Sequence, residues 1–81
     1  MPVASIIIPC YNASLYISQT IDSACKQTEQ DLEIICVDDG STDDTLSILH
    51  KKAELDTRIK VFTQQNAGEG PAREYGRTQA H

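Results

Sequence analysis

The feature that most constrains this chain is an apolar run, Ile34 to Val37, followed directly by Asp38, Asp39 and Gly40. Continuous apolar runs of this kind are typical of strands that helices cover on both faces of a parallel sheet. In open sheets of that type, ligands bind in the crevice at the carboxyl ends of the strands. The run therefore predicts a buried strand whose carboxyl end places Asp38 and Asp39 at a binding site.

Two further segments predict strands beside this one. The segment Val3–Ile8 is rich in β-branched residues and is followed by Pro9, which cannot donate to a strand ladder and is expected to end the strand. The central strand is expected over Leu32–Val37, and a third, shorter one over Ile59–Thr63.

The first helix is expected between the first two strands. Asn12 or Ser14 can cap it, and it should run to about Gln27. Its apolar residues recur at helical spacing, so one stripe faces the sheet. The stripe comprises Ile17, Ile21, Ala24 and Thr28.

The second helix is expected to start within Ser41–Asp44, which offers a cap and two acids for the positive end of the helix dipole. Its buried stripe should comprise Leu46, Leu49 and Ala53. The third helix should follow the loop residues 66–70 and begin at Pro71, because proline suits the first helical position. In that helix the small residues Ala72, Gly76 and Ala80 form a seam that allows close approach to a sheet.

The resulting order is β-α-β-α-β-α in a single domain of 81 residues. Strands that alternate with helices predict an α/β fold, with a parallel sheet, right-handed crossovers and the strand order 3-2-1. In that order the strand Val3–Ile8 has an open edge without charge or internal proline, so we expect self-association through it.

Composition narrows the range of partners. Lys and Arg number 7 against 12 Asp and Glu, a formal charge of −5, which argues against a nucleic-acid partner. The longest apolar stretch is too short to cross a bilayer. Cys10, Cys25 and Cys36 lack Cys-X-X-Cys spacing, and His50 and His81 have no companion metal ligands, so we expect reduced thiols in a cytoplasmic protein and no metal cage.

Three kinds of candidate site residue meet at the expected strand ends. Adjacent strand residues point to opposite faces, so one of Asp38 and Asp39 should bind a ligand while the other supports it; alternatively, the pair only caps a helix or is solvated. Tyr11 can stack on a nucleobase, or it can pack over the first helix. Arg73 can meet a base or phosphate, or it can form a weak surface pair.

The chain resembles the N-terminal part of the family 2 glycosyltransferases. The resemblance rests on segments 5–12 (SIIIPCYN), 27–28 (QT), 33–43 (EIICVDDGSTD) and 65–68 (QNAG), with Ala72-Arg73 and Gly76. Cys10 and Pro71 depart from the usual residue types without removing a binding group. The resemblance implies the N-terminal half of a GT-A fold, a three-layer αβα arrangement, which transfers a sugar with inversion from a nucleotide-diphosphate donor, often UDP-linked.

The resemblance also implies roles for individual residues. The segment Pro9-Cys10-Tyr11 would hold the base, with the aromatic ring stacked on it. Asp39, beside Asp38, would hydrogen-bond the base, and Arg73 would lie near base and phosphates. The Asp-X-Asp metal motif and the catalytic base of the family have no counterpart here. Residues 1–81 are therefore interpreted as a truncated nucleotide-sugar-binding portion, and manganese or magnesium would bind only in the complete enzyme.

The sugar, lipid-linked or polysaccharide acceptor and any membrane association would then depend on regions absent from this chain. A response-regulator receiver needs its acid pair after the first strand, and here that strand ends in Pro9. A non-catalytic nucleotide-binding or assembly module remains an alternative.

Overall fold

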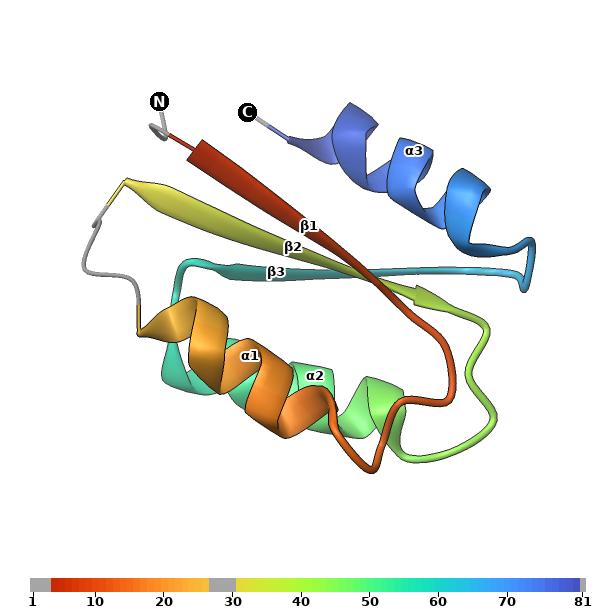
Figure 1. Cartoon of the computed structure of the whole chain (residues 1–81), viewed down its shortest axis with the longest axis horizontal. Helices are drawn as coiled ribbons and strands as arrows, with labels where there is room; N and C mark the ends of the chain where they lie inside the picture. Colours follow the sequence, from red (N-terminus) through yellow and green to blue (C-terminus); the bar gives the residue numbers. More distant parts are fainter. Residues whose placement is uncertain (1–3, 27–30, 81) are drawn as a thin grey trace.

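The computed structural model describes residues 4–26 and 31–80 (Figure 1). Its elements are β1 Ala4–Cys10, α1 Ile17–Cys25, β2 Leu32–Asp39, α2 Thr45–Leu55, β3 Ile59–Gln64 and α3 Glu69–Gln79. The three strands form one parallel sheet in the order β1-β2-β3, which is the predicted order 3-2-1 read from the other edge. The predictions that fall on Val3, Gln27, Thr28 and His81 concern positions outside the described residues.

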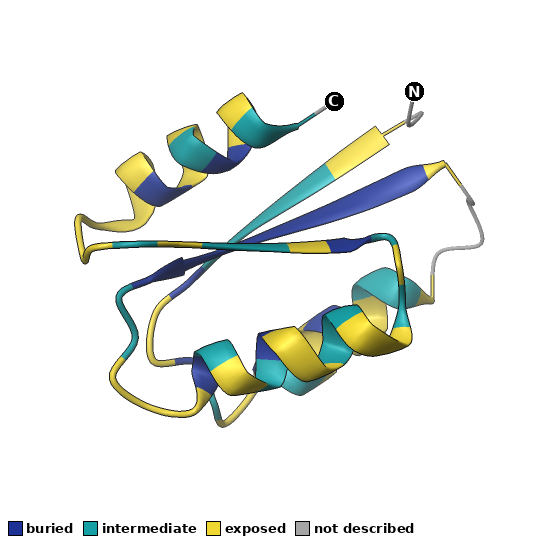
Figure 2. Ribbon diagram, turned by 180° about the vertical axis from the view of Figure 1, so that it is seen from behind, coloured by how far each residue is buried: buried dark blue, intermediate teal, exposed yellow. Residues whose placement is uncertain are grey.

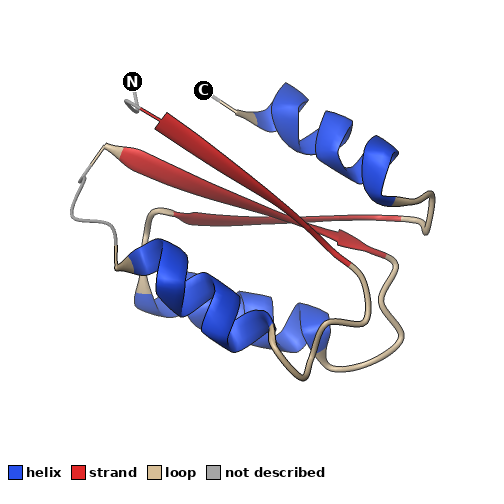
Figure 3. Cartoon of the chain, viewed as in Figure 1, coloured by secondary structure: helices blue, strands red, loops and turns tan. Residues whose placement is uncertain are grey.

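The sheet lies between two helical layers, which confirms the predicted three-layer α/β fold. Helices α1 and α2 cover one face and α3 covers the other (Figure 3). All eight residues of β2 are buried, as the continuous dark blue strand in Figure 2 shows. The apolar run thus forms the central strand, as predicted.

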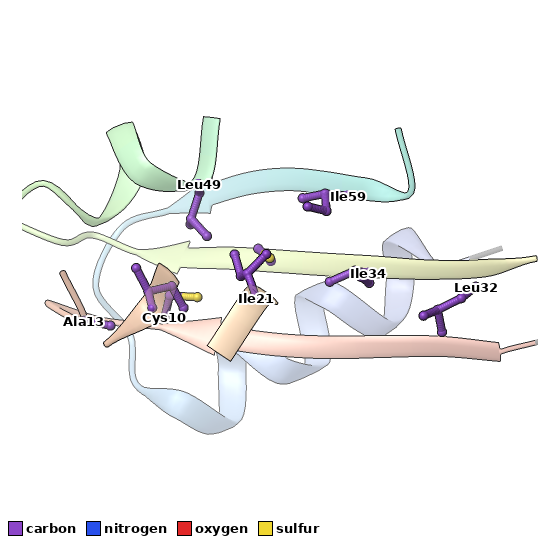
Figure 4. Close-up of a cluster of buried hydrophobic side chains, with 9 residues drawn as sticks. Cys10, Ala13, Ile21, Leu32, Ile34, Leu49 and Ile59 are labelled. Atoms are coloured by element: carbon purple, nitrogen blue, oxygen red, sulfur yellow. The ribbon is translucent and has the colours of Figure 1, made fainter. Parts of the chain in front are cut away.

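The larger part of the core lies between the sheet and the α1/α2 layer (Figure 4). Ile21 of α1 and Leu49 of α2 are fully buried there against Ile34 of β2. Around them lie Cys10, Ala13, Ile17, Leu32, Cys36 and Ile59. The described part of the stripe predicted for the first helix therefore faces the sheet, with Ala24 only partly buried. In α2, Leu49 and the partly buried Ala53 face the sheet, but the prediction for Leu46 was wrong: Leu46 is outside the core, and Ile48 packs against the core instead.

The small-residue seam of α3 packs on the other face of the sheet. Ala72 and Gly76 are buried, and Ala80 is partly buried against Ile35 and Val37. A methyl group added at Gly76 would meet a Val37 methyl carbon at 3.2 Å, so the helix lies unusually close to the strands. This confirms the packing role predicted for the seam.

Pro9 does not end the first strand, contrary to the prediction. β1 continues to Cys10, and Pro9 pairs in register with Val37 of β2. β1 is an edge strand of the described sheet, where a missing backbone N–H is tolerated.

The predicted helix starts were also too early or too late. α1 begins at Ile17, and neither Asn12 nor Ser14 caps it, because the loop before it turns toward the β2–α2 loop. α2 begins at Thr45, so Asp43 and Asp44 precede its first turn. α3 begins at Glu69, which places Pro71 at its third position, where helical N–H groups still lack partners within the helix.

Cys10, Cys25 and Cys36 are all free thiols, and Cys10 and Cys36 are buried. The neighbouring Cys10 thiol, followed by burial, raises the pKa of the Cys36 thiol far above its usual range. These two side chains therefore pack as small apolar groups. In the described part of the chain, no helix has the length and apolar character needed to cross a membrane.

Candidate nucleotide-binding site

A pocket of about 530 Å³ opens at the carboxyl ends of β1 and β2. This is the place where a parallel sheet of this type binds ligands. Its walls come from the β1–α1 loop, the end of β2 and the loop that leads into α3. The lining residues are Pro9, Cys10, Tyr11, Tyr16, Asp39, Asn66, Gly68 and Glu69.

Three of the five predicted site residues meet in this pocket: Pro9, Tyr11 and Asp39. Tyr11 is 51% exposed, so a face of its ring remains available to a ligand. Tyr16, which the sequence analysis did not select, adds a second half-exposed ring at 57%. The pocket therefore offers aromatic surface of the kind that stacks on nucleobases.

Asp39 organises the loop between β3 and α3. Its Oδ1 accepts hydrogen bonds from Gln64 Nε2 and from the Ala67 backbone N–H, both at 2.8 Å. Its Oδ2 accepts from the Gly68 backbone N–H at 2.9 Å and from Asn66 Nδ2 at 3.3 Å. A carboxylate has about four acceptor positions, and here four donors from the chain use them.

The bonds from Gln64, first, and from the Ala67 and Gly68 N–H groups hold the pKa of the Asp39 carboxyl below its usual range, although burial raises it. The Ala67 and Gly68 N–H groups directly precede α3, where the helix dipole also favours a negative charge. Asp39 thus occupies the Ala67 and Gly68 N–H groups ahead of α3, which leaves these two donors unavailable to a ligand phosphate.

Asp38 lies on the opposite face of β2 from Asp39, as the alternation of strand residues predicts. It is 2% exposed and is not among the residues that line the pocket. Its Oδ2 accepts a hydrogen bond from the Thr63 hydroxyl at 3.3 Å, while Oδ1 has no partner among the described residues. The side chain joins the ends of β2 and β3 beneath the site.

Arg73 lies one helical turn beyond the pocket. Its Nη2 pairs with Glu69 Oε1 at 2.6 Å, and Glu69 lines the pocket. Both side chains are more than half exposed, so this is a weak surface pair that a ligand anion could replace. The structure therefore places Arg73 beside the pocket, with Glu69 between them.

Polar residues of the β1–α1 and β2–α2 loops form a clamp that connects these loops. Asn12 adopts a left-handed conformation with φ of 46°, and its N–H donates to Ser41 Oγ at 2.9 Å. In return, Asn12 Oδ1 accepts from the Thr42 N–H at 2.8 Å. The clamp fixes the loop segment that begins with Tyr11.

Asp43 and Thr45 form the second half of this clamp. Asp43 accepts hydrogen bonds from the Thr45 hydroxyl, the Thr45 N–H and the Ser14 N–H. These bonds, the Thr45 hydroxyl first, lower the pKa of the Asp43 carboxyl to about 2. The Thr45 hydroxyl oxygen accepts in turn from the Ala13 N–H at 2.8 Å, in a fully buried position.

Cys10 lies in the segment 9–11 that the resemblance assigned to the base, and four other lining residues were not predicted from the sequence: Tyr16, Asn66, Gly68 and Glu69. The loop signal of Asn66 and Gly68 was visible, and this loop follows a parallel strand, so its place at the same rim could have been inferred. The position of Tyr16 depends on where α1 begins, which the sequence did not predict correctly.

The described residues do not form a metal site, since no three His, Cys, Asp or Glu side chains gather in a suitable group. Asp39 and Glu69 are the acids at the pocket, and Asp39 is already bound to its own loop. No chemical step is therefore assigned to a metal held by these residues.

The fold is that of the GT-A sugar transferases. The mannosyltransferase PcManGT from Pyrobaculum calidifontis, in complex with GDP-Man and Mn²⁺, superimposes with a TM-score of 0.90 at 26% identity, over 99% of this chain and 25% of that chain. The S. aureus protein TarS (residues 1–349), in complex with UDP-GlcNAc, gives a TM-score of 0.88 at 35% identity, over 100% of this chain and 24% of that chain.

Sequence comparison gives the same class and specifies the family. The family model described as Glycosyl transferase family 2 matches residues 5–81, and the chain belongs to this family. Chondroitin synthase from Escherichia coli is 47% identical over 89% of this chain and 10% of its own length. An uncharacterized glycosyltransferase from Haemophilus influenzae is 44% identical over 94% of this chain and 31% of its own length. The chain thus spans less than a third of these relatives.

Proposed function

We propose that this chain is the donor-binding portion of an inverting glycosyltransferase that uses a nucleotide-diphosphate sugar, with UDP as the nucleotide. The observation that carries the proposal is the pocket at the carboxyl ends of β1 and β2, with two half-exposed tyrosines in its wall. Family membership and the GT-A fold support it.

In this proposal the nucleobase stacks on Tyr11 and contacts Pro9. Asp39 holds the loop that closes the pocket, and a base N–H could bond to it only by replacing one of its four donors. Asp38 supports the strand ends from below. Arg73 leaves Glu69 and approaches the diphosphate when the donor binds.

The negative charge of the chain is the reason to propose a divalent cation beside the donor diphosphate. The chain has a formal charge of −5, and Glu69 contributes an acid to the pocket wall. A divalent cation, manganese or magnesium, would have to be held by residues beyond those described here, and it would stabilise the leaving diphosphate. PcManGT was solved with Mn²⁺ and GDP-Man, which is consistent with this need in a related enzyme.

The acceptor is proposed to be a sugar, a lipid-linked sugar or a polysaccharide, bound by other parts of the complete enzyme. One relative is a GalNAc(5)-diNAcBac-PP-undecaprenol beta-1,3-glucosyltransferase from Campylobacter jejuni, 42% identical over 88% of this chain and 23% of its own length. Free, buried thiols favour a cytoplasmic setting, and any membrane contact would come from those other parts.

A second candidate is a non-catalytic nucleotide-binding or assembly module. Asp39 lines the pocket but already bonds to its own loop, and this favours the second candidate. Among the described residues, Glu69 is then the one pocket-lining carboxylate that does not bond to that loop. The two candidates predict the same nucleotide binding and differ in sugar transfer by a complete protein.

Calorimetric titration of the chain with UDP, a UDP-sugar and ATP, with and without manganese, tests the proposal. We expect weak binding of the uridine ligands, no binding of ATP and no sugar transfer by the chain alone. Absence of uridine nucleotide binding under all conditions would refute the donor-site assignment. Transfer by a pure sample of this chain would refute the incomplete-site part of the proposal.

A further inference from the structure

Glu69, the first residue of α3, places a carboxylate at the wall of the pocket. The loop after β3 carries the start of α3 to the carboxyl ends of the strands (Figure 1). The Glu69 side chain is 73% exposed and reaches solvent at this wall. Among the described residues that line the pocket, none is Lys, Arg or His. The described part of the wall therefore carries acids without a cation of its own.

The two acids of this wall differ in their partners. Asp39 accepts hydrogen bonds from four donors, two of them backbone N–H groups. Glu69 is instead paired with Arg73, whose Nη2 lies 2.6 Å from Oε1, and Arg73 does not line the pocket. An anion that enters the pocket is therefore repelled by Glu69 and has to compete with it for the Arg73 guanidinium.

A nucleoside-diphosphate sugar and the nucleoside diphosphate that remains after sugar transfer differ in charge. In the donor each phosphate carries one negative charge, because the terminal phosphate is esterified to the sugar. After transfer the terminal phosphate has a second ionisable oxygen, with a pKa of about 6 as in phosphate monoesters. Above that pH the released diphosphate carries about one negative charge more than the donor.

We propose that Glu69 discriminates between the sugar donor and the released diphosphate, because it repels the more highly charged product more strongly. This rests on the proposed function, since it requires that a nucleotide-diphosphate sugar occupies the pocket. The discrimination needs no direct contact, because repulsion between exposed charges acts over about 10 Å at an ionic strength of about 0.1 M. Glu69 thereby favours departure of the product over departure of the donor.

The test compares uridine, UDP and UDP-glucose as ligands of the unmodified chain and of Glu69→Gln. NMR titrations at about 20 mM salt, with a chelator present, give the affinities. Glu69→Gln should bind UDP about fivefold and UDP-glucose about twofold more tightly than the unmodified chain, and uridine equally well. Glu74→Gln is the matched control, because Glu74 lies on the same helix, pairs with Arg77 at 3.5 Å and does not line the pocket. It should leave all three affinities unchanged.

Both substitutions alter side chains that are more than half exposed, so both variants should fold, which circular dichroism checks. An equal gain for all three ligands would point to a change in pocket shape and would overturn the inference. An unchanged ratio of the UDP and UDP-glucose affinities in Glu69→Gln would overturn it as well. Either result leaves the proposed function intact, whereas failure of all three ligands to bind the unmodified chain would overturn both.

Salt dependence gives a second measurement that a purely structural role of Glu69 would not affect. Raising sodium chloride from about 20 mM to about 500 mM screens the repulsion, so the unmodified chain should gain affinity for UDP relative to UDP-glucose. The same change in salt should alter this ratio less in Glu69→Gln. An equal salt dependence of the ratio in the two proteins would overturn the inference.

Discussion

Gly76 of α3 lies so close to Ile7 of β1 that a Cβ on the glycine would stand 2.6 Å from the Ile7 Cγ2 atom. The same Cβ would meet a Val37 methyl carbon at 3.2 Å. Val37 is fully buried and Ile7 is partly buried against α3, and such β-branched side chains cannot move aside easily in a close-packed interior. The absence of a side chain at Gly76 therefore sets the distance between α3 and the sheet, and α3 begins with Glu69, which lines the pocket.

Replacement of Gly76 by Ala should lower the free energy of unfolding by about 1–3 kcal/mol, because the added methyl group overfills this contact. Chemical denaturation followed by circular dichroism measures the change. Gly70→Ala is the control, since a Cβ there meets no atom within 4 Å. It should leave stability unchanged or raise it by up to about 1 kcal/mol. Equal effects of the two variants would contradict the packing argument.

Replacement of Thr45 by Val should destabilise the chain by about 1–3 kcal/mol, because the buried Ala13 N–H loses its acceptor. Thr45→Ser keeps the hydroxyl and should retain most of the stability. Thr42→Val removes an exposed hydroxyl that donates to Asn12 at 3.3 Å, so it should cost less than about 0.5 kcal/mol. The three unfolding curves are compared directly, and a Thr45→Val variant as stable as Thr42→Val would count against the clamp.

The clamp should also depend on pH through Asp43. Its pKa is lowered from 3.8 to about 2 in the folded chain, so folding favours the carboxylate. This contribution is fully present above the unfolded pKa and is lost as the pH falls from about 4 toward 2. Asp43→Asn should therefore be less stable than the unmodified chain at pH 6, and the difference should shrink over that range.

Asp44→Asn is the matched control for charge, because the Asp44 side chain makes no cap hydrogen bond. At pH 6 it should cost less stability than Asp43→Asn. A stability difference for Asp43→Asn that stays constant with pH would show that the carboxylate is not the stabilising form.

Replacement of Tyr11 by Ala should weaken UDP binding by about 1–3 kcal/mol through the loss of a stacking ring. Tyr11→Phe keeps the ring and should bind nearly as well as the unmodified chain. Leu15→Ala is the control on the same loop, because Leu15 is 96% exposed and does not line the pocket. Isothermal calorimetry gives the affinities, and unchanged binding by Tyr11→Ala would remove Tyr11 from the proposed site.

Self-association through the open edge of β1 stays a prediction, and the structure refines it. Pro9 lies inside β1, so that end of the edge is already protected against pairing. Ile7 packs against α3, which makes it a poor place for a test substitution. Ala4 is exposed, so Ala4→Lys should shift a dimer toward monomer in analytical ultracentrifugation, with Ala4→Ser as control. A monomeric unmodified chain at high concentration would refute the prediction.

Local patterns in the sequence were enough to predict the elements and their order. The run Ile34 to Val37 predicted a fully buried central strand, and the small residues at Ala72 and Gly76 predicted a close helix–sheet contact; the structure confirms both. Apolar periodicity determines which face of an element is buried, and alternating strands and helices leave few topologies open.

Helix starts were predicted less well because the polar residues near them have partners far away in sequence. Asn12 looks like a helix cap, yet its side-chain Oδ1 accepts a hydrogen bond from the Thr42 N–H, 30 positions further along the chain. Ser14, the other expected cap, donates its backbone N–H to Asp43. Local capping and a contact between two loops use the same hydrogen-bonding groups. The sequence does not show which of the two a given side chain makes.

The sequence by itself determined that Asp38 and Asp39 stand at the end of a central strand and point to opposite faces. Only the tertiary structure decided what each one does there. Asp39 meets the N–H groups ahead of α3 and is fully bonded, whereas Asp38 is buried beside Thr63. Only the folded chain brings Tyr16 into the same pocket wall as Tyr11. The physical reason is that each polar side chain has a limited number of hydrogen-bonding groups, and segments distant in sequence compete for them. Which partners bond is decided only when those segments pack together.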